Sequence, residues 1–265
     1  LTTLNVSDEN VTIGYESFYN CDGLTELALP EGINSIGGRA FYDCNNLTSA
    51  TVGSTATSIG QYAFGQCNNL TELTIPFVGG TPDDGNGLSY VFGDQWNMPQ
   101  SLRKVNVTDS TTVKPYAFQS LQYVEEIVYT QDVTEIGNYA FESCTALKRV
   151  ELGDAIETIG SYSFSNCYAL KSFTIPAGCQ SVGDYAFAWC YALYEVYNDS
   201  DLTFAEWDMT YLRNNCLAYR TDDTAVEKVS VDGVELLLAD NGTWYVVNYT
   251  GDSESLALPA SFTSN

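Results

Sequence analysis

Histidine is absent from this chain of 265 residues, and basic side chains are scarce. Without histidine, the commonest general base and the usual catalytic triads are excluded. Only 10 Lys and Arg stand against 34 Asp and Glu, which gives a formal net charge of -24. A surface of this charge repels nucleic-acid phosphates and anionic lipids, so we expect neither as a partner.

Long apolar runs and nucleotide-binding motifs are also absent. No stretch is apolar over the roughly 18 residues that a membrane span needs, so we expect no membrane insertion by this segment. There is no G-x-G-x-x-G, P-loop or C-x-x-C motif, and the carboxylates follow no spacing that indicates an acid–base pair. We therefore predict no catalytic, metal-binding or cofactor-binding residue, and neither enzyme activity nor a cofactor.

What the sequence does contain is a repeat. The phrase I-G-x-x-A-F-x-x-C-x-x-L returns every 23 residues, with one Val in place of Ile. Its phenylalanines are Phe18, Phe41, Phe64, Phe141, Phe164 and Phe187. A fixed period of this length predicts a repeat solenoid, in which each coil buries its apolar face against its neighbours.

Each coil carries a short strand signal. In the phrase L-x-x-L-x-L-P, as over residues 24–30, apolar and polar side chains alternate, and the final Pro ends the strand. Residues 34–37 are typical of a second extended segment, whose glycine we expect to permit an unusual turn. The A-F-x-x-C stretch favours one 3₁₀ or α-helical turn. The coils therefore predict mainly short parallel strands around one phenylalanine column and three aliphatic columns.

Six of the eight cysteines occupy one repeat position, namely Cys21, Cys44, Cys67, Cys144, Cys167 and Cys190. Stacked strands lie about 4.8 Å apart, which brings the Cα atoms within range for disulfides. The Cβ vectors would nevertheless run parallel, and Leu121 fills this position in another coil, so we predict buried free thiols. Cys179 and Cys216 are off register, and a disulfide between them stays open.

The register breaks twice. An expanded coil at about 77–108 adds eight residues, and its loop suits either binding or a tolerated excursion. Its Asp83–Asn86 segment lacks the spaced ligands of a calcium loop. The array covers 1–197, 198–234 is predicted to be an irregular capping or connecting segment, and 235–265 to be a β-hairpin leading into a further repeat. Both ends look cut, so we interpret the chain as a fragment.

A row of tyrosines is the candidate binding surface. Two places before the core phenylalanine stand Tyr62, Tyr90, Tyr116, Tyr139, Tyr162 and Tyr185, whereas Glu16 and Arg39 hold this place in the first two coils. Tyrosine joins an apolar ring to a polar tip, which suits recognition of proteins or sugars. Alternatively, the rings stack on one another and seal the edge of the core.

These residues together resemble the BspA-like, or treponemal-type, leucine-rich repeat family. The matching motif is I-G-x-x-A-F-x-x-C-x-x-L-x-x-L-x-L-P, which covers residues 1–197 and, less fully, the last ten. The resemblance implies a right-handed leucine-rich-repeat coil in a bacterial protein that is on the cell surface or secreted. It also implies adhesion to host matrix or cell-surface proteins, and it transfers no site residue.

Our leading hypothesis is a monomeric, non-catalytic extracellular module for surface adhesion or protein binding, whose ligand is a host or neighbouring-cell protein. One alternative is a structural spacer that projects another domain. Others are a carbohydrate-binding surface on the tyrosine row, or a segment that targets an enzyme elsewhere in the polypeptide.

Overall fold

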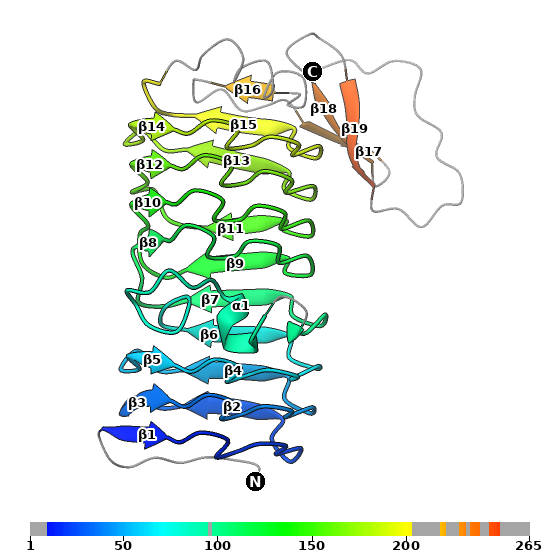
Figure 1. The fold of residues 1–265 in the computed structure, drawn as a ribbon. Helices are drawn as coiled ribbons and strands as arrows, with labels where there is room; N and C mark the ends of the chain where they lie inside the picture. The colour runs from blue at the N-terminus through cyan, green and yellow to red at the C-terminus, as the bar shows by residue number, and fades with distance from the viewer. Residues whose placement is uncertain are drawn as a thin grey trace. The chain divides into compact units, whose positions relative to one another are not determined.

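The computed structural model describes residues 10–94 and 97–202, together with the backbone of four further strands between 218 and 249. By its internal contacts the chain divides into two units, residues 1–222 and 223–265. The first unit is a solenoid of parallel strands, as the repeat predicts (Figure 1).

The longer strands of the solenoid form one side of every coil. A six-stranded parallel sheet contains, in spatial order, β11 (Arg149–Glu151), β9 (Glu126–Tyr129), β7 (Lys104–Val107), β6 (Glu72–Ile75), β4 (Ser49–Val52) and β2 (Glu26–Leu29). A separate three-stranded sheet continues with β13 (Ser172–Ile175), β15 (Glu195–Asn198) and β16 (Ala218–Arg220). Pro30 and Pro76 follow the ends of β2 and β6, as expected for residues that cannot donate to the ladder.

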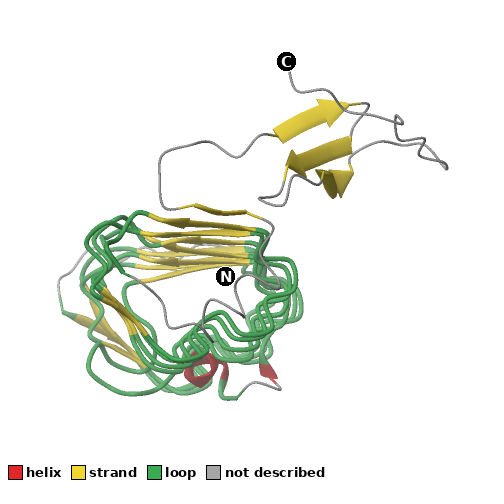
Figure 2. Ribbon diagram, turned by 90° about the horizontal axis from the view of Figure 1, so that it is seen from above, coloured by secondary structure: helices red, strands yellow, loops and turns green. Residues whose placement is uncertain are grey.

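Shorter strands form a second side of the coils (Figure 2). One sheet comprises β1 (Val11–Ile13), β3 (Ile33–Ile36) and β5 (Ser58–Ile59). Beyond the expanded coil, the other comprises β8 (Thr112–Val113), β10 (Glu135–Ile136), β12 (Thr158–Ile159) and β14 (Ser181–Val182). Turns complete each coil.

Phenylalanines from successive coils form the centre of the core. The rings of Phe118, Phe141 and Phe164 lie parallel, with centroids 5.3 and 4.8 Å apart, and all three side chains are fully buried. Phe18, Phe41 and Phe64 stack in the same way before the expanded coil, at 5.2 and 5.6 Å. The predicted phenylalanine column is therefore confirmed on both sides of the expanded coil.

The A-F-x-x-C stretch consists of consecutive tight turns. In one coil, the amides of Ala40 and Tyr42 donate to the carbonyls three residues earlier, which is 3₁₀-type bonding. Arg39 and Asp43 adopt positive φ angles of 55° and 61°, so the bonds do not propagate into a helix. Phe41 donates instead to the carbonyl of Ala63 in the next coil, at 2.9 Å.

The repeated glycines are needed for a reason other than the expected unusual turn. None of the six has a positive φ. A Cβ atom at Gly160 would lie 2.5 Å from the amide nitrogen of Asn138, and one at Gly60 would lie 2.3 Å from that of Gly38. Except at Gly14, whose Cβ would meet only the Ser17 hydroxyl of its own coil, the glycines therefore allow neighbouring coils to approach each other, and the expectation based on backbone freedom is wrong.

The cysteine column consists of six free thiols, as predicted, and Cys179, which lies outside the column, is free as well. The Sγ atom of Cys144 donates to the carbonyl of Phe118 at 3.0 Å, and equivalent bonds recur along the column. Burial raises the pKa of Cys67 and of Cys144 to about 12. The thiols thus act as small, neutral donors between coils, while Cys216 lies outside the described residues.

The expanded coil includes α1 (Ser89–Phe92), which buries Val91 and Phe92. In the preceding loop, the Asp84 carboxylate accepts hydrogen bonds from the amides of Gly80, Thr81 and Asn86 at 2.8–3.1 Å. These amides satisfy the carboxylate, so the Asp83–Asn86 segment serves to close the loop.

Strands also occur where an irregular segment is expected, over 198–234. Strand β16 pairs in parallel with β15, and β17 (Lys228–Val231) belongs to the second unit. There, β18 (Val234–Leu238) pairs antiparallel with both β17 and β19 (Trp244–Tyr249). The expected hairpin is therefore part of a three-stranded antiparallel sheet, and the further repeat expected after it lies outside the described residues.

Candidate functional site

Four of the six candidate tyrosines form a continuous stack, which we call the tyrosine ladder: Tyr116, Tyr139, Tyr162 and Tyr185. Successive ring centroids lie 5.2, 5.1 and 5.1 Å apart, and the first two pairs are nearly parallel. The two end rings are exposed, and the two middle rings are half-buried. The structure thus shows the stacking that one interpretation of the sequence predicts.

The ladder residues adopt a left-handed backbone conformation, with φ angles of 55° to 61°. This conformation costs on the order of 1 kcal/mol for a residue with a bulky side chain. Ring stacking, which is worth about 0.5–1.5 kcal/mol per pair, offsets this cost. The tyrosine side chains are consequently held in one orientation by their neighbours in the stack.

The other two candidates lie apart from the ladder. Tyr62 contacts Tyr42 edge-on at 6.2 Å and lies beneath the Arg39 guanidinium, whose carbon is 5.6 Å from its ring centroid. Tyr90 belongs to α1 and packs partly buried beside Gly80. The expanded coil therefore interrupts the row of six that the sequence suggests.

A shallow groove of about 290 Å³ runs next to the ladder. It is lined by Gly137, Gly160 and Gly183 and by Pro115, Asn138 and Ser161, which directly precede three of the ladder tyrosines. Because ring faces within the ladder cover each other, mainly ring edges and hydroxyl groups remain for a ligand. This geometry favours hydrogen bonding to a ligand over stacking of a ligand on the ring faces.

The electrostatics of the ladder are acidic. Burial and the neighbouring Tyr185, Tyr139, Asp184 and Glu142 raise the pKa of Tyr162, so its hydroxyl stays protonated. The ladder consequently offers phenol donors beside carboxylates.

Further exposed aromatic side chains, which the pattern of six tyrosines does not include, accompany the same turns. Tyr168 and Tyr191 stack at 5.6 Å and are 44% and 66% exposed. Trp189 has a positive φ of 58° and is also exposed. The signal that could have found the pair is its separation of one period, 23 residues.

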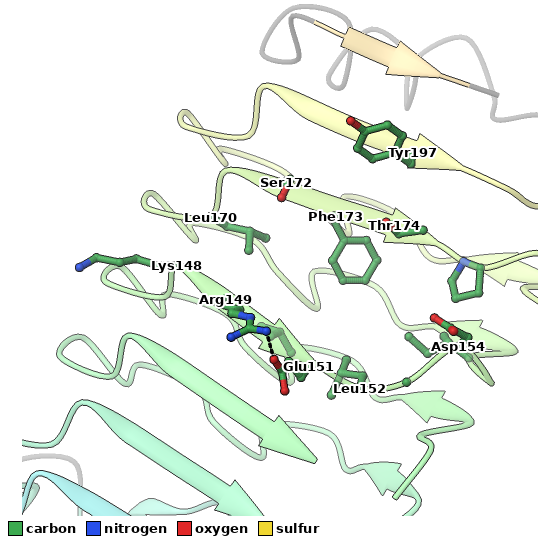
Figure 3. Close-up of a pocket in the computed structure, with 14 residues that line it drawn as sticks. Lys148, Arg149, Glu151, Leu152, Asp154, Leu170, Ser172, Phe173, Thr174 and Tyr197 are labelled. Carbon is green, nitrogen blue, oxygen red and sulfur yellow. Dashed lines mark ion pairs between the residues drawn. The ribbon is translucent and has the colours of Figure 1, made fainter. Parts of the chain in front are cut away.

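A second hollow, of about 390 Å³, opens in the sheet of longer strands (Figure 3). It lies where β11 and β13 do not pair, and Val150, Phe173 and Leu152 contribute to its lining. Lys148 and Arg149 stand at one end and Asp154 at the other. No sequence motif pointed to this interruption.

Neither site brings together the ligands of a metal ion. Within 10–94 and 97–202, no three His, Cys, Asp or Glu side chains are grouped for such a role. The same part of the chain contains no helix with the length and hydrophobicity that crossing a bilayer requires.

Comparison with solved structures finds other leucine-rich repeat proteins. A leucine-rich repeat protein of Bacteroides ovatus is 27% identical over 71% of this chain and 43% of its own, with a TM-score of 0.40. One from Eubacterium ventriosum is 22% identical over 70% of this chain and 46% of its own, with a TM-score of 0.47. The chain thus spans less than half the length of either protein.

A leucine-rich repeat protein of T. pallidum is 20% identical over 80% of this chain and 79% of its own, with a TM-score of 0.37. No curated relative matches. The model of the BspA type leucine rich repeat region matches six copies over residues 1–78 and 96–218, which is well over half of the sequence. With the 23-residue period, the stacked phenylalanines and the parallel strands all in agreement, the chain belongs to the BspA type leucine-rich repeat family.

Proposed function

We propose that this chain is a non-catalytic, extracellular protein-binding module of a bacterial surface protein, and that it attaches to a host matrix or neighbouring-cell protein. The observation that carries the proposal is the tyrosine ladder beside its groove. Family membership supports a binding role, since the repeats of such proteins build extended surfaces.

Stacking prepares the ladder for binding. Tyrosine is enriched at the energetic centres of interfaces because it combines a large apolar area with a hydroxyl donor. Binding also costs entropy when side chains must be ordered, typically about 0.5–1.5 kcal/mol for each. Rings that already lie 5.1–5.2 Å apart have little freedom left to lose.

The charge of the chain defines its partner further. With a net charge of -24, the molecule as a whole attracts basic surfaces. Asp184 and Glu142 act electrostatically on Tyr162 in the ladder itself. We therefore propose a partner surface that is rich in lysine and arginine.

Biolayer interferometry of the full chain over separately immobilised, purified extracellular-matrix proteins tests the proposal. A double variant, Tyr139→Asn with Tyr162→Asn, should bind at least ten-fold more weakly, since asparagine tolerates the positive φ but supplies no ring. The matched control replaces Tyr19 and Tyr42 by asparagine. Those rings stack at 5.4 Å but lie outside the ladder.

Equal affinities for the folded ladder variant, the control and the parent chain would contradict the proposal. A chain that binds none of these proteins, while the ladder substitutions change only its stability, would instead favour the structural spacer.

A further inference from the structure

The sheet of longer strands is interrupted at one position only within the described solenoid. Elsewhere, each coil bonds to the one before it: the Lys148 amide donates to the Glu125 carbonyl at 2.8 Å, and Tyr194 donates to Lys171 at 3.1 Å. The equivalent bond from the Lys171 amide to the Lys148 carbonyl is absent, and no residue of β11 pairs with β13.

The opposite side of the same two coils remains closed. Strand β12 pairs with β14 through Thr158–Ser181 and Ile159–Val182. The coils are therefore joined on one side and separated on the other. Figure 1 shows β11 and β13 as consecutive strands on the separated side.

A single large residue stands at the separated position. Near the middle of each long strand, one side chain points into the core. In six strands that pair with their neighbours this side chain is small or aliphatic and buried: Leu27, Ala50, Leu73, Val105, Ile127 and Val196. In β13 this position is Phe173, whose ring packs against Phe164 at 4.9 Å and Phe187 at 5.0 Å. A ring in a space shaped for an aliphatic side chain displaces the neighbouring backbone. Val150 and Phe173 are accordingly only partly buried.

The gap presents two parallel strand edges that bear unpaired backbone groups. Such edges are templates for an additional strand, since they offer amide donors and carbonyl acceptors in a row. Lys148 and Arg149 lie at the amino-terminal end of the gap, where Arg149 forms an ion pair with Glu151, and Asp154 lies towards its carboxyl-terminal end (Figure 3). Cations are notable here because the whole chain has only 10.

We propose that the gap between β11 and β13 binds an extended peptide segment of a partner protein, which adds to the sheet as a parallel strand. The segment carries acidic residues at its amino-terminal end and an apolar residue at its centre. The acidic residues share Lys148 and Arg149 with Glu125, Glu126 and Glu151, their ion-pair partners within the chain, and the apolar residue covers Val150 and Phe173. This peptide site is separate from the ladder and extends the proposed protein-binding function to a second surface.

Strand β9 illustrates the chemistry of such a segment. It pairs with the other edge of β11, and there Glu125 contacts Lys148 at 2.7 Å while Glu126 contacts Arg149 at 3.3 Å. Its central Ile127 is buried. A synthetic peptide copying residues 124–130, Val-Glu-Glu-Ile-Val-Tyr-Thr, is therefore a suitable probe.

The test measures binding of this fluorescent peptide to the full chain by anisotropy. Two control peptides have the same side chains but N-methylated amides. In the first, every second amide is methylated, and in the second, the amides between them are. Because alternate amides of a strand face opposite neighbours, each control cannot pair with one of the two edges. We expect saturable binding of the probe, at least ten-fold weaker binding of both controls, and new hydrogen-exchange protection at residues 149–151 and 172–174.

A protein variant tests the cause of the gap. Phe173→Val should allow β11 and β13 to pair and should weaken peptide binding at least ten-fold. The matched control, Ile127→Val, lies at the same position of a paired strand and should leave peptide binding unchanged. If Phe173→Val does not fold, the N-methylated peptides still decide the outcome.

Absence of saturable binding, or equal binding of the N-methylated peptides, would overturn the inference. So would a chain that is already dimeric, with protected amides in β11 and β13, since a second copy would then occupy the gap. Binding of matrix proteins by the Phe173→Val variant distinguishes the two proposals. If it persists while the peptide fails to bind the parent chain, only the peptide site is refuted.

Discussion

Replacement of Phe141 by alanine tests whether aligned rings hold the coils together. Its side chain is fully buried, and its ring stacks at 5.3 Å on Phe118 and at 4.8 Å on Phe164. Replacing a buried phenylalanine by alanine removes apolar burial and leaves a cavity, which typically costs about 3–5 kcal/mol of stability. Because Phe141 also loses ring stacking on both faces, its cost falls in the upper half of that range. We therefore expect the free energy of unfolding to fall by about 4–5 kcal/mol.

Phe18 is the natural comparison because it stands at the end of its stack. It is only partly buried and contacts one ring of the column, Phe41, at 5.2 Å. Phe18→Ala should therefore cost roughly half as much, about 2 kcal/mol, by the same reasoning. Urea unfolding of the full chain, followed by far-ultraviolet circular dichroism, measures both values.

Two results would contradict this prediction: equal costs for the two substitutions, or a change of less than about 1 kcal/mol in the free energy of unfolding for Phe141→Ala. Either result would mean that burial between two stacked rings does not stabilise the coils as proposed.

Three further predictions concern coil spacing, thiol ionisation and charge. Gly160→Ala should destabilise the chain by about 2 kcal/mol or more, because the added Cβ would lie 2.5 Å from a backbone atom. Gly14→Ala should cost much less, because its Cβ meets only the Ser17 hydroxyl at 3.1 Å. Thermal unfolding of the two variants compares these costs. Burial raises the pKa of Cys67 and of Cys144 from 9.0 to about 12. The stabilising contribution of these thiols is thus complete below about pH 8.5 and is lost by roughly 1.4 kcal/mol per pH unit for each thiol as the pH rises towards 12. Urea unfolding midpoints measured at pH 7–10.5 should show this loss, and the Cys67→Ala variant should show a smaller one. Finally, binding of a basic partner should weaken as NaCl rises from 50 to 500 mM in interferometry, and affinity independent of salt would contradict the electrostatic argument.

Most of the solenoid could be predicted because each coil repeats the environment of the last. A phenylalanine that recurs every 23 residues meets its own copy in the next coil, so Phe118, Phe141 and Phe164 had to stack once the period was known. The free thiols followed from the same regularity, since parallel Cβ vectors suit packing better than disulfides.

The candidate site was less predictable because it depends on departures from the repeat. The six-tyrosine pattern does not reveal that Tyr90 lies in α1 and that Tyr62 contacts Tyr42, so the stacked ladder holds four residues. Likewise, Phe173 reads as one more apolar residue in a strand. Its effect on the pairing of β11 with β13 depends on how much room the Phe164 and Phe187 rings leave.

The sequence alone determined the repeat length, the strand positions and the identity of the buried columns, because periodicity fixes which side chains meet. Only the tertiary structure decided how closely the coils approach. That spacing makes Gly60 and Gly160 necessary, brings four tyrosine rings into contact, and leaves β11 and β13 apart. The physical reason is that spacing between coils is set by the combined volume of all packed side chains, which no single position in the sequence specifies.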